Sequence, residues 1–307
     1  MGRTRSATAR DGETAKRWLV VLTAAFATLT AICGALVLPQ SDALATDSSR
    51  QLKATVATPE AKLSASAPTQ APPPPAHDTV AFFGDSLGYQ AQPYLDTFFA
   101  EAGTDTVSNN TFGGTATCDW LTKMAAAAAG HPAAAVLVFS GNAFTPCMER
   151  VVPHSPQYYD LYRTYTEQAI GIFAAVGTHV FLVGTPIGAS SVPGWDRLDA
   201  LYRQLAQANP VAVSYVDAGA AVESASGGFT WQLPCLRTEP SCGRGGTNVV
   251  RAPDGTHFCP DGTPATAGVT GPCDEYSSGA FRFALAMQSA VTQYLHPVPA
   301  LQVRTAR

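Results

Sequence analysis

Three polar residues have the types and the local spacing of a serine nucleophile with its base. Ser86 lies in the stretch FGDSLG (residues 83–88), directly after a run of apolar residues, and Asp254 and His257 lie three residues apart near the other end of the chain. A hydroxyl is a weak nucleophile until a base takes its proton. An imidazole does this near neutral pH, and a carboxylate fixes its tautomer. The residues therefore predict acyl transfer through a serine.

Each stretch also has a simpler interpretation. Asp85 or Ser86 would serve equally well as the N-cap of a following helix. Asp254 and His257 would equally well form a local hydrogen bond within a loop. The remaining histidines have no comparable setting, and we expect His77, which ends a linker, and His179, which precedes a strand, to be solvated; the others are His131, His154 and His296.

Two further loops carry groups that can stabilise an oxyanion. Gly113 and Gly114 form a glycine pair, which allows a backbone N–H to approach a ligand closely, although such pairs more often only make a turn. Asn142 follows a buried apolar segment, where its amide can donate to an oxyanion or cap a turn.

The pattern of apolar residues alternates between short buried strands and longer amphipathic helices. We expect strands at 79–83, around Val107, and at 134–139, 180–183 and 212–216, and helices at 90–102, 120–129, 156–175, 195–208 and 277–295. A cysteine- and glycine-rich loop fills 231–273. This alternation predicts an α/β fold of parallel βαβ units with helices on both faces of the sheet. Functional residues of such sheets follow the carboxyl ends of the strands.

Taken in order, these blocks resemble the SGNH/GDSL hydrolase family. The resemblance rests on Gly84-Asp85-Ser86-Leu87, on the glycine of Gly113-Gly114, on Gly141-Asn142 and on Asp254-x-x-His257, and it spans essentially the whole domain. It implies a three-layer α/β/α fold around a mainly parallel, flavodoxin-like sheet. It also implies Ser86 as nucleophile, His257 as base and Asp254 as its orienter, with an oxyanion hole from the N–H groups of Ser86 and Gly114 and the side chain of Asn142. One departure is that Ala143-Phe144 follows Gly141-Asn142, where the family usually has Gly-x-Asn-Asp.

A rival family shares the serine motif. Residues 84–88 also satisfy G-x-S-x-G, the nucleophile elbow of α/β-hydrolases. That fold places several strands before the serine and takes its acid and histidine from separate loops. Here the serine follows the first strand, and Asp254 and His257 share one loop, so we favour the first family.

The N-terminal region predicts export. Residues 1–17 are basic, 18–38 form an uncharged apolar run, and 39–77 form an Ala/Ser/Pro-rich linker ahead of a domain at 78–297 and a tail at 298–307. At about 1.5 Å per residue the apolar run spans roughly 30 Å, which is one bilayer core. We expect a signal anchor with a cytoplasmic N-terminus and an extracytoplasmic domain. The alternative is a secreted protein cleaved near Ala45.

The cysteines agree with an oxidising compartment. The chain has seven, and setting aside Cys33 in the apolar run leaves six. An even number in an exported domain predicts disulfides. Sequence proximity suggests Cys235–Cys242 and Cys259–Cys273, leaving Cys118–Cys147. A zinc site has little support because no C-x-x-C pair occurs.

Composition narrows the choice of function. The net charge of -4 comes with no basic stripe beyond the N-terminus, so we expect no nucleic-acid partner. The proposed chemistry needs no metal or cofactor.

The predicted function is an esterase acting on O-acyl groups, acetyl or short acyl, of envelope glycan or glycolipid; the alternatives are an O-acyltransferase and an inactive tethered binding module. Candidates for a sugar groove, for most of which core packing is the simpler role, are Trp120, Trp195, Trp231 and the pair Tyr158-Tyr159.

Overall fold

Five parallel strands form the centre of the fold. The computed structural model describes residues 78–190, 197–262 and 273–297. Its central sheet has the order β2-β1-β3-β4-β5, with all pairs parallel. This is the flavodoxin-like strand order, so the predicted α/β sheet is confirmed. The strands are β1 (Thr79–Gly84), β2 (Asp105–Thr111), β3 (Ala134–Val138), β4 (His179–Val183) and β5 (Val213–Val216).

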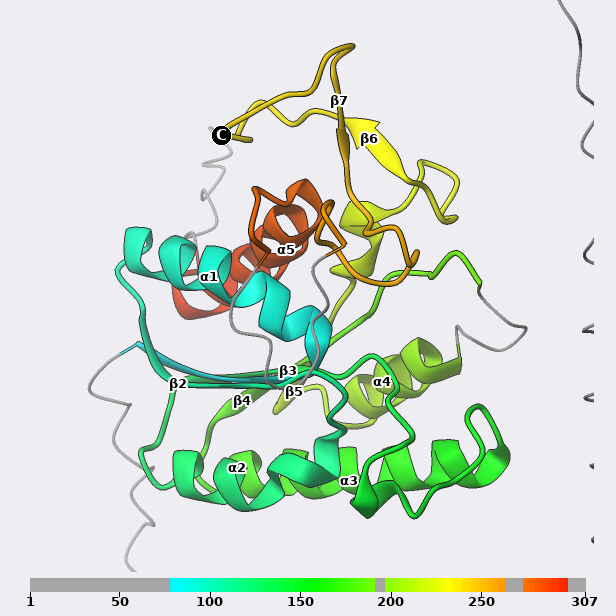
Figure 1. Cartoon of the computed structure of the whole chain (residues 1–307). Coiled ribbons are helices and arrows are strands. Elements are labelled where there is room, and N and C mark those ends of the chain that lie inside the picture. Colours follow the sequence, from blue (N-terminus) through cyan, green and yellow to red (C-terminus); the bar gives the residue numbers. More distant parts are fainter. Residues whose placement is uncertain (1–77, 191–196, 263–272, 298–307) are drawn as a thin grey trace, which may run out of the picture. The chain divides into compact units, whose positions relative to one another are not determined.

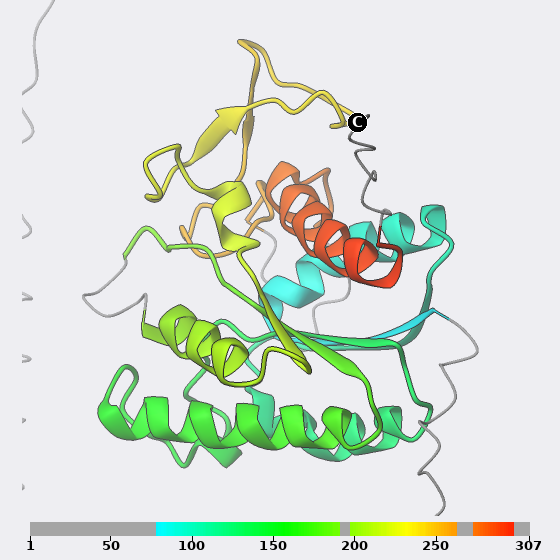
Figure 2. The ribbon, with the colours of Figure 1, turned by 180° about the vertical axis from the view of Figure 1, so that it is seen from behind.

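Helices cover both faces of this sheet, which gives three layers (Figures 1 and 2). One face carries α1 (Ser86–Glu101) and α5 (Ser278–Leu295); the other carries α2 (Leu121–Ala128), α3 (Pro156–Ala174) and α4 (Arg197–Ala208). Neighbouring residues of β1 point to opposite faces. Phe82 accordingly joins the apolar cluster beneath α1 and α5, and Phe83 joins the cluster above α2, α3 and α4.

The first helix begins four residues earlier than the sequence predicts, at Ser86 instead of Gln90. The side chain of Asp85 accepts a hydrogen bond from Leu87 N at 3.0 Å and so caps the helix. This cap supplies an acceptor for a free N–H of the first turn, which offsets the low helix propensity of Ser86 and Gly88. As a result Ser86 is the first helical residue.

The expectation for His179 was wrong. It is the first residue of β4, it is 5% exposed, and its ring stacks on Tyr294 of α5 with 4.1 Å between the ring centroids. Its Nε2 lies 2.9 Å from Ser214 Oγ. Burial lowers the pKa of this imidazole, although the backbone contact with Val211 opposes the shift. The local pattern did not show that α5, more than a hundred residues later, covers this strand end.

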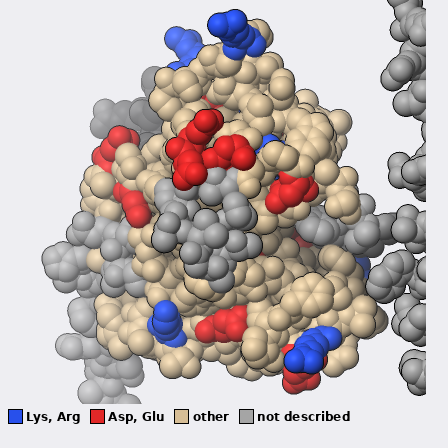
Figure 3. Space-filling model, in the orientation of Figure 1, with Lys and Arg blue, Asp and Glu red and all other residues tan. Residues whose placement is uncertain are grey.

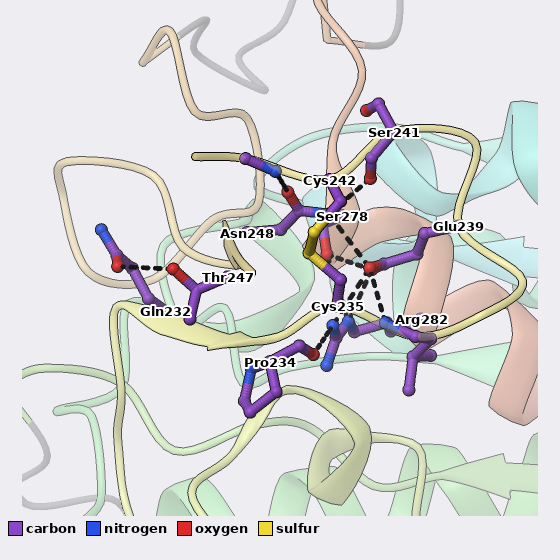
Figure 4. Close-up of a disulfide and its surroundings, with 12 residues drawn as sticks. Gln232, Pro234, Cys235, Glu239, Ser241, Cys242, Thr247, Asn248, Ser278 and Arg282 are labelled. Carbon is purple, nitrogen blue, oxygen red and sulfur yellow. Dashed lines mark hydrogen bonds and ion pairs between the residues drawn. A yellow bond between two sulfur atoms is a disulfide. The ribbon is translucent and has the colours of Figure 1, made fainter. Parts of the chain in front are cut away.

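The predicted cysteine-rich loop contains an antiparallel hairpin of β6 (Gln232–Pro234) and β7 (Thr247–Val249). Next to it, the Cys235–Cys242 disulfide closes a short loop that carries Glu239 (Figure 4). Arg282 of α5 donates from Nε to Glu239 Oε1 at 2.8 Å, and both side chains are almost completely buried. This ion pair attaches the hairpin region to α5.

The other two predicted disulfides, Cys118–Cys147 and Cys259–Cys273, are also present, so all three predicted pairings are confirmed. Short 3₁₀ helices lie at Thr117–Trp120, Pro146–Met148 and Gly219–Val222.

The predicted anchor at 18–38, the linker at 39–77 and the tail at 298–307 lie outside the described residues. Among the residues that are described, none of the helices is both apolar enough and long enough to cross a bilayer. On the face shown in Figure 3, most of the described surface is uncharged, and the acidic and basic side chains form small separate groups.

Candidate active site

Ser86 lies at the junction between β1 and α1. Its residue is 6% exposed, and its backbone N–H belongs to the first turn of α1, where the helix dipole favours negative charge. The turn is tight because Asp85 N donates to Val138 O at 3.0 Å and Tyr89 N donates to Asp85 O at 2.8 Å. The nucleophile candidate is thus held by β3 on one side and by its own helix on the other.

Asp85 connects this turn to the loop after β3. Its Oδ2 accepts hydrogen bonds from Ser140 N at 2.6 Å, from Ser140 Oγ at 2.5 Å and from Asn142 Nδ2 at 3.1 Å. Complete burial raises the pKa of Asp85, although the hydrogen bonds from Ser140 and from Leu87 N oppose that rise. The sequence assigned Asp85 at most a capping role; the structure adds the fixing of Ser140 and Asn142.

Asp254 and His257 share one short loop. Asp254 Oδ1 accepts from Thr256 N at 2.8 Å and from His257 N at 3.0 Å, which is a local turn that aspartate side chains commonly stabilise. The other carboxylate oxygen, Oδ2, lies 2.6 Å from His257 Nδ1. On the far side of the ring, His257 Nε2 lies 2.9 Å from Ser86 Oγ. The structure therefore brings together the three residues that the sequence singled out.

The electrostatics of the loop assign the direction of these hydrogen bonds. Partial burial raises the pKa of Asp254, but hydrogen bonds from the His257 side chain, from His257 N and from Thr256 N outweigh it and hold the pKa below its ordinary value. An ionised carboxylate can only accept, so Nδ1 of His257 carries the proton that points to Asp254. In the neutral ring Nε2 is then an acceptor and faces the hydroxyl of Ser86.

The loop is fixed to α1 by Gln90. This buried side chain accepts from Phe258 N at 2.8 Å through its Oε1. Gln90 is four residues after Ser86, so both lie on the same side of α1. Sequence reasoning missed Gln90; a polar residue at this helical spacing from the serine was the available signal.

Gly255 makes the close approach of the loop to its neighbour possible. Its φ is +74°, and an added Cβ would lie 2.3 Å from Ala189 Cβ. Ala189 N donates to Gly255 O at 3.0 Å, and Ala252 N donates to His257 O at 2.8 Å. These contacts define the path of the backbone between Asp254 and His257.

The predicted oxyanion donors lie on adjacent loops. Gly114 has a φ of +80°, and no described residue accepts a hydrogen bond from its N–H. Asn142 Nδ2 donates to Thr115 O at 3.0 Å as well as to Asp85, so both amide hydrogens have acceptors. Tyr162 Oη donates to Asn142 O at 3.0 Å. These contacts hold Asn142 in place, although the aspartate that usually follows this asparagine in the SGNH/GDSL family is absent.

Most of the aromatic residues considered for a sugar groove are in the core. Trp120 is 7%, Tyr158 1% and Tyr159 8% exposed. Trp195 lies outside the described residues, and Trp231 is 46% exposed. Two exposed phenylalanines that the sequence did not single out lie close in the chain to Gly114 and Asn142; they are Phe112 and Phe144.

The family described as "Protein of unknown function (DUF459)" matches residues 79–269, a span that includes Ser86, Asp254 and His257. The chain belongs to this family. No curated protein matches this DUF459 protein significantly.

Solved structures similar to the DUF459 protein include a GDSL-like lipase from Bacteroides thetaiotaomicron, with 14% identity, a TM-score of 0.46, and coverage of 71% of this chain and 89% of the other. Another is the catalytic domain of Streptococcus pneumoniae peptidoglycan O-acetyltransferase A, with 16% identity, a TM-score of 0.40, and coverage of 71% and 94%. A third is a psychrotrophic esterase from a Pseudoalteromonas species, with 14% identity, a TM-score of 0.35, and coverage of 45% and 76%.

Proposed function

We propose that this protein is a serine esterase with Ser86 as nucleophile, His257 as base and Asp254 as the group that orients the base. The observation that carries the proposal is the continuous chain of contacts from Ser86 Oγ to His257 Nε2 at 2.9 Å and from His257 Nδ1 to Asp254 Oδ2 at 2.6 Å. A base within hydrogen-bond reach of the hydroxyl, itself oriented by a third group, is the arrangement that activates a serine.

The reaction begins when Ser86 Oγ attacks the ester carbonyl while its proton passes to His257 Nε2. The tetrahedral intermediate carries negative charge on the former carbonyl oxygen. His257 then gives its proton to the leaving alcohol, which leaves an acyl group on Ser86. Water, activated by the same imidazole, attacks this acyl-enzyme and releases the acid. Asp254 stabilises the imidazolium in both halves of the reaction.

The oxyanion would be stabilised by the backbone N–H groups of Ser86 and Gly114 and by the Asn142 amide. The first lies at a helix N-terminus, which adds the helix dipole. The Asn142 hydrogens already have acceptors in Asp85 and Thr115, so this amide would share one of them with the oxyanion.

The substrate we propose is an O-acyl ester, with an acetyl or short acyl group, on envelope glycan or glycolipid. The three disulfides indicate an oxidising compartment, and residues 18–38 would anchor the chain in the membrane. Phe112 and Phe144 are 44% and 83% exposed beside the oxyanion loops, where they offer apolar faces to a sugar or an acyl group.

Hydrolysis is favoured over acyl transfer to an alcohol by the openness of the triad. The Asp254 side chain is 53% exposed and that of His257 is 24% exposed, so the base is partly accessible to water. An intact set of triad contacts likewise favours an enzyme over a binding module that has lost activity.

The test is hydrolysis of p-nitrophenyl acetate by the full-length protein, beside Ser86→Ala. We expect turnover by the wild type and loss of it in the variant. Turnover retained by Ser86→Ala would refute the mechanism. Product analysis with added sugar acceptors separates the two reactions, because a transferase would form acetylated sugar in place of acetate.

A further inference from the structure

Arg251 is a buried arginine directly before the loop that carries Asp254 and His257. It is 1% exposed, and within the described ranges no carboxylate forms an ion pair with it. Its Nε has no hydrogen-bond partner among the described residues. Burial lowers its pKa to about 10, against the weaker opposing effect of Glu223 and Asp254, so the guanidinium remains charged at neutral pH.

A buried arginine without an ionic partner contributes little to the stability of the fold, because its burial has a cost that few contacts offset. Removing a cation from water without an opposite charge is costly. The rings of Phe229 and Phe258, with centroids 5.8 Å and 5.6 Å from the guanidinium carbon, offset part of that cost through cation–π contacts. A well-packed apolar side chain of similar length would fill the same space at lower cost. The geometry of its two donated hydrogen bonds therefore indicates what the charge does there.

These two hydrogen bonds join two segments of the site. Arg251 Nη1 donates to Thr256 O at 3.1 Å, and Nη2 donates to Ile187 O at 2.8 Å. Thr256 is the residue immediately before His257, and Ile187 lies in the segment that follows β4. The Ile187 segment is itself fixed, because Ile187 N donates to Glu223 Oε1 at 2.9 Å. The planar guanidinium thus sets the distance between the His257 loop and a fixed part of the scaffold.

We propose that Arg251 is a positioning residue of the active site, which holds the 254–257 loop so that His257 Nε2 stays in line with Ser86 Oγ. The inference rests on the proposed function in that it assigns His257 the role of base. The contact itself acts on the Asp254–His257 pair whether or not an ester is hydrolysed. The proposed function and the role of Arg251 can therefore be tested separately.

The test compares Arg251→Met and Arg251→Lys with a matched control in the full-length protein. The control is the double variant Arg282→Met/Glu239→Gln, which removes another buried guanidinium together with its carboxylate partner (Figure 4). The hydrogen bonds of this pair go to Pro234, Leu236, Asn248 and Ser278, and none of them reaches Ser86, Asp254 or His257. Thermal unfolding of each variant measures stability. Kinetics with p-nitrophenyl acetate separate kcat from KM, and the downfield proton resonance of His257 Nδ1–H, recorded without substrate, reports its hydrogen bond to Asp254.

We expect Arg251→Met to lower kcat about 10–100-fold, because displacing a catalytic group by about 1 Å costs that much, with little change in KM. The downfield resonance should broaden or disappear. Arg251→Lys, which keeps one donor and the charge, should recover part of both. The control should lose stability but keep kcat and the resonance.

Wild-type kcat and resonance in a folded Arg251→Met would overturn the inference. If that variant does not fold, an unchanged kcat and resonance in Arg251→Lys would do the same. Equal losses in the control would also overturn it, because they would indicate general loosening. If the wild type hydrolyses no ester, the proposed function fails, whereas the resonance still decides the role of Arg251.

Discussion

Asp254 differs from the other aspartate at the site in its exposure and its partners. Its side chain is half exposed and its carboxylate accepts three hydrogen bonds from its own loop. Asp85, by contrast, is fully buried and fixes Ser140 and Asn142. In the proposed mechanism the two carboxylates have separate tasks: Asp254 orients His257, and Asp85 orients the loop that carries Asn142.

Asp254→Asn should lower kcat by about 10³–10⁴-fold, in line with the effect of such a change in a serine protease triad. The asparagine oxygen can still accept from Thr256 N and His257 N, so the loop should keep its fold. Its amide nitrogen would face Nδ1 as a donor and favour the wrong tautomer of His257. Steady-state kinetics and thermal unfolding check this.

The matched control is Asp217→Asn, since Asp217 is an exposed carboxylate whose ion pair among the described residues is with exposed Arg203. Such pairs are worth little, so neither kcat nor stability should change much. A kcat for Asp254→Asn close to that of the control would contradict the assignment.

The sequence was sufficient to predict Ser86, Asp254 and His257 as candidates because their types and local spacings are visible in the chain. It could not predict Gln90 or Arg251. The contacts of these two, with Phe258 N and Ile187 O, join backbone groups far apart in the sequence. The helical spacing of Gln90 from Ser86 indicates only that both lie on one side of α1. Backbone partners leave no trace in residue types, so only the folded structure shows these contacts.

Among the elements, the 254–257 loop depends on Gly255. Gly255→Ala adds a Cβ that would lie 2.3 Å from Ala189 Cβ, so the loop must shift. We expect kcat to fall by at least about tenfold, because the shift moves His257 away from Ser86. Steady-state kinetics with p-nitrophenyl acetate measure it.

Gly227→Ala separates backbone strain from this displacement. Gly227 has almost the same φ, +75°, but an added Cβ meets nothing within 4 Å. This variant should lose about 1 kcal/mol of stability and keep kcat. Equal kcat losses in the two variants would show that the approach to Ala189 is unimportant.

Asp199 of α4 makes the junction with β4 and β5 sensitive to pH. It accepts from Thr185 N at 3.1 Å and from Tyr215 Oη at 3.2 Å. Burial raises its pKa to about 6, with a smaller contribution from Asp217, against the opposing hydrogen bonds. The stability contribution of this group is therefore complete below pH 4 and is lost as the pH rises through about 6.

Asp199→Asn removes this titration. We expect the difference in unfolding free energy between the variant and the wild type to shift in favour of the variant by on the order of 2 kcal/mol from pH 4 to pH 7. Urea titrations of both proteins at the two pH values provide the comparison. A difference between the two proteins that stays constant with pH would exclude Asp199 as the titrating group.

Strands β1, β3 and β4 were predictable because continuous apolar runs mark strands buried on both faces, and most helices were predictable from the helical spacing of their apolar residues. The edge strand β2 has the polar sequence DTVSNNT, so the sequence indicated it only around Val107. The start of α1 was not predictable, because the capping contact of Asp85 outweighs the weak helix propensity of Ser86 and Gly88. The hairpin of β6 and β7 was not predicted, because its strands are three residues long and only partly buried, so no periodic pattern marks them.

In the molecule as a whole, contacts between distant segments assemble the site. Ser86 and His257 are 171 residues apart in the chain. The Cys259–Cys273 disulfide begins two residues after His257, and Ser277 Oγ donates to Phe258 O at 2.7 Å. These contacts connect the His257 loop to the start of α5. The alternation of strands and helices predicted the parallel sheet, whereas its flavodoxin-like order came from the family resemblance. The even number of cysteines predicted disulfides, but proximity along the chain only suggested their pairing, because six cysteines allow 15 connectivities.

The central claim is that an acyl group passes through Ser86. Rapid acid quenching of the full-length protein with p-nitrophenyl acetate, followed by peptide mass spectrometry, tests it most directly. We predict an acetyl adduct on the peptide that contains Ser86, and its absence in Ser86→Ala. An ester hydrolysed with no adduct on any residue, or with an adduct on a residue other than Ser86, would contradict the account.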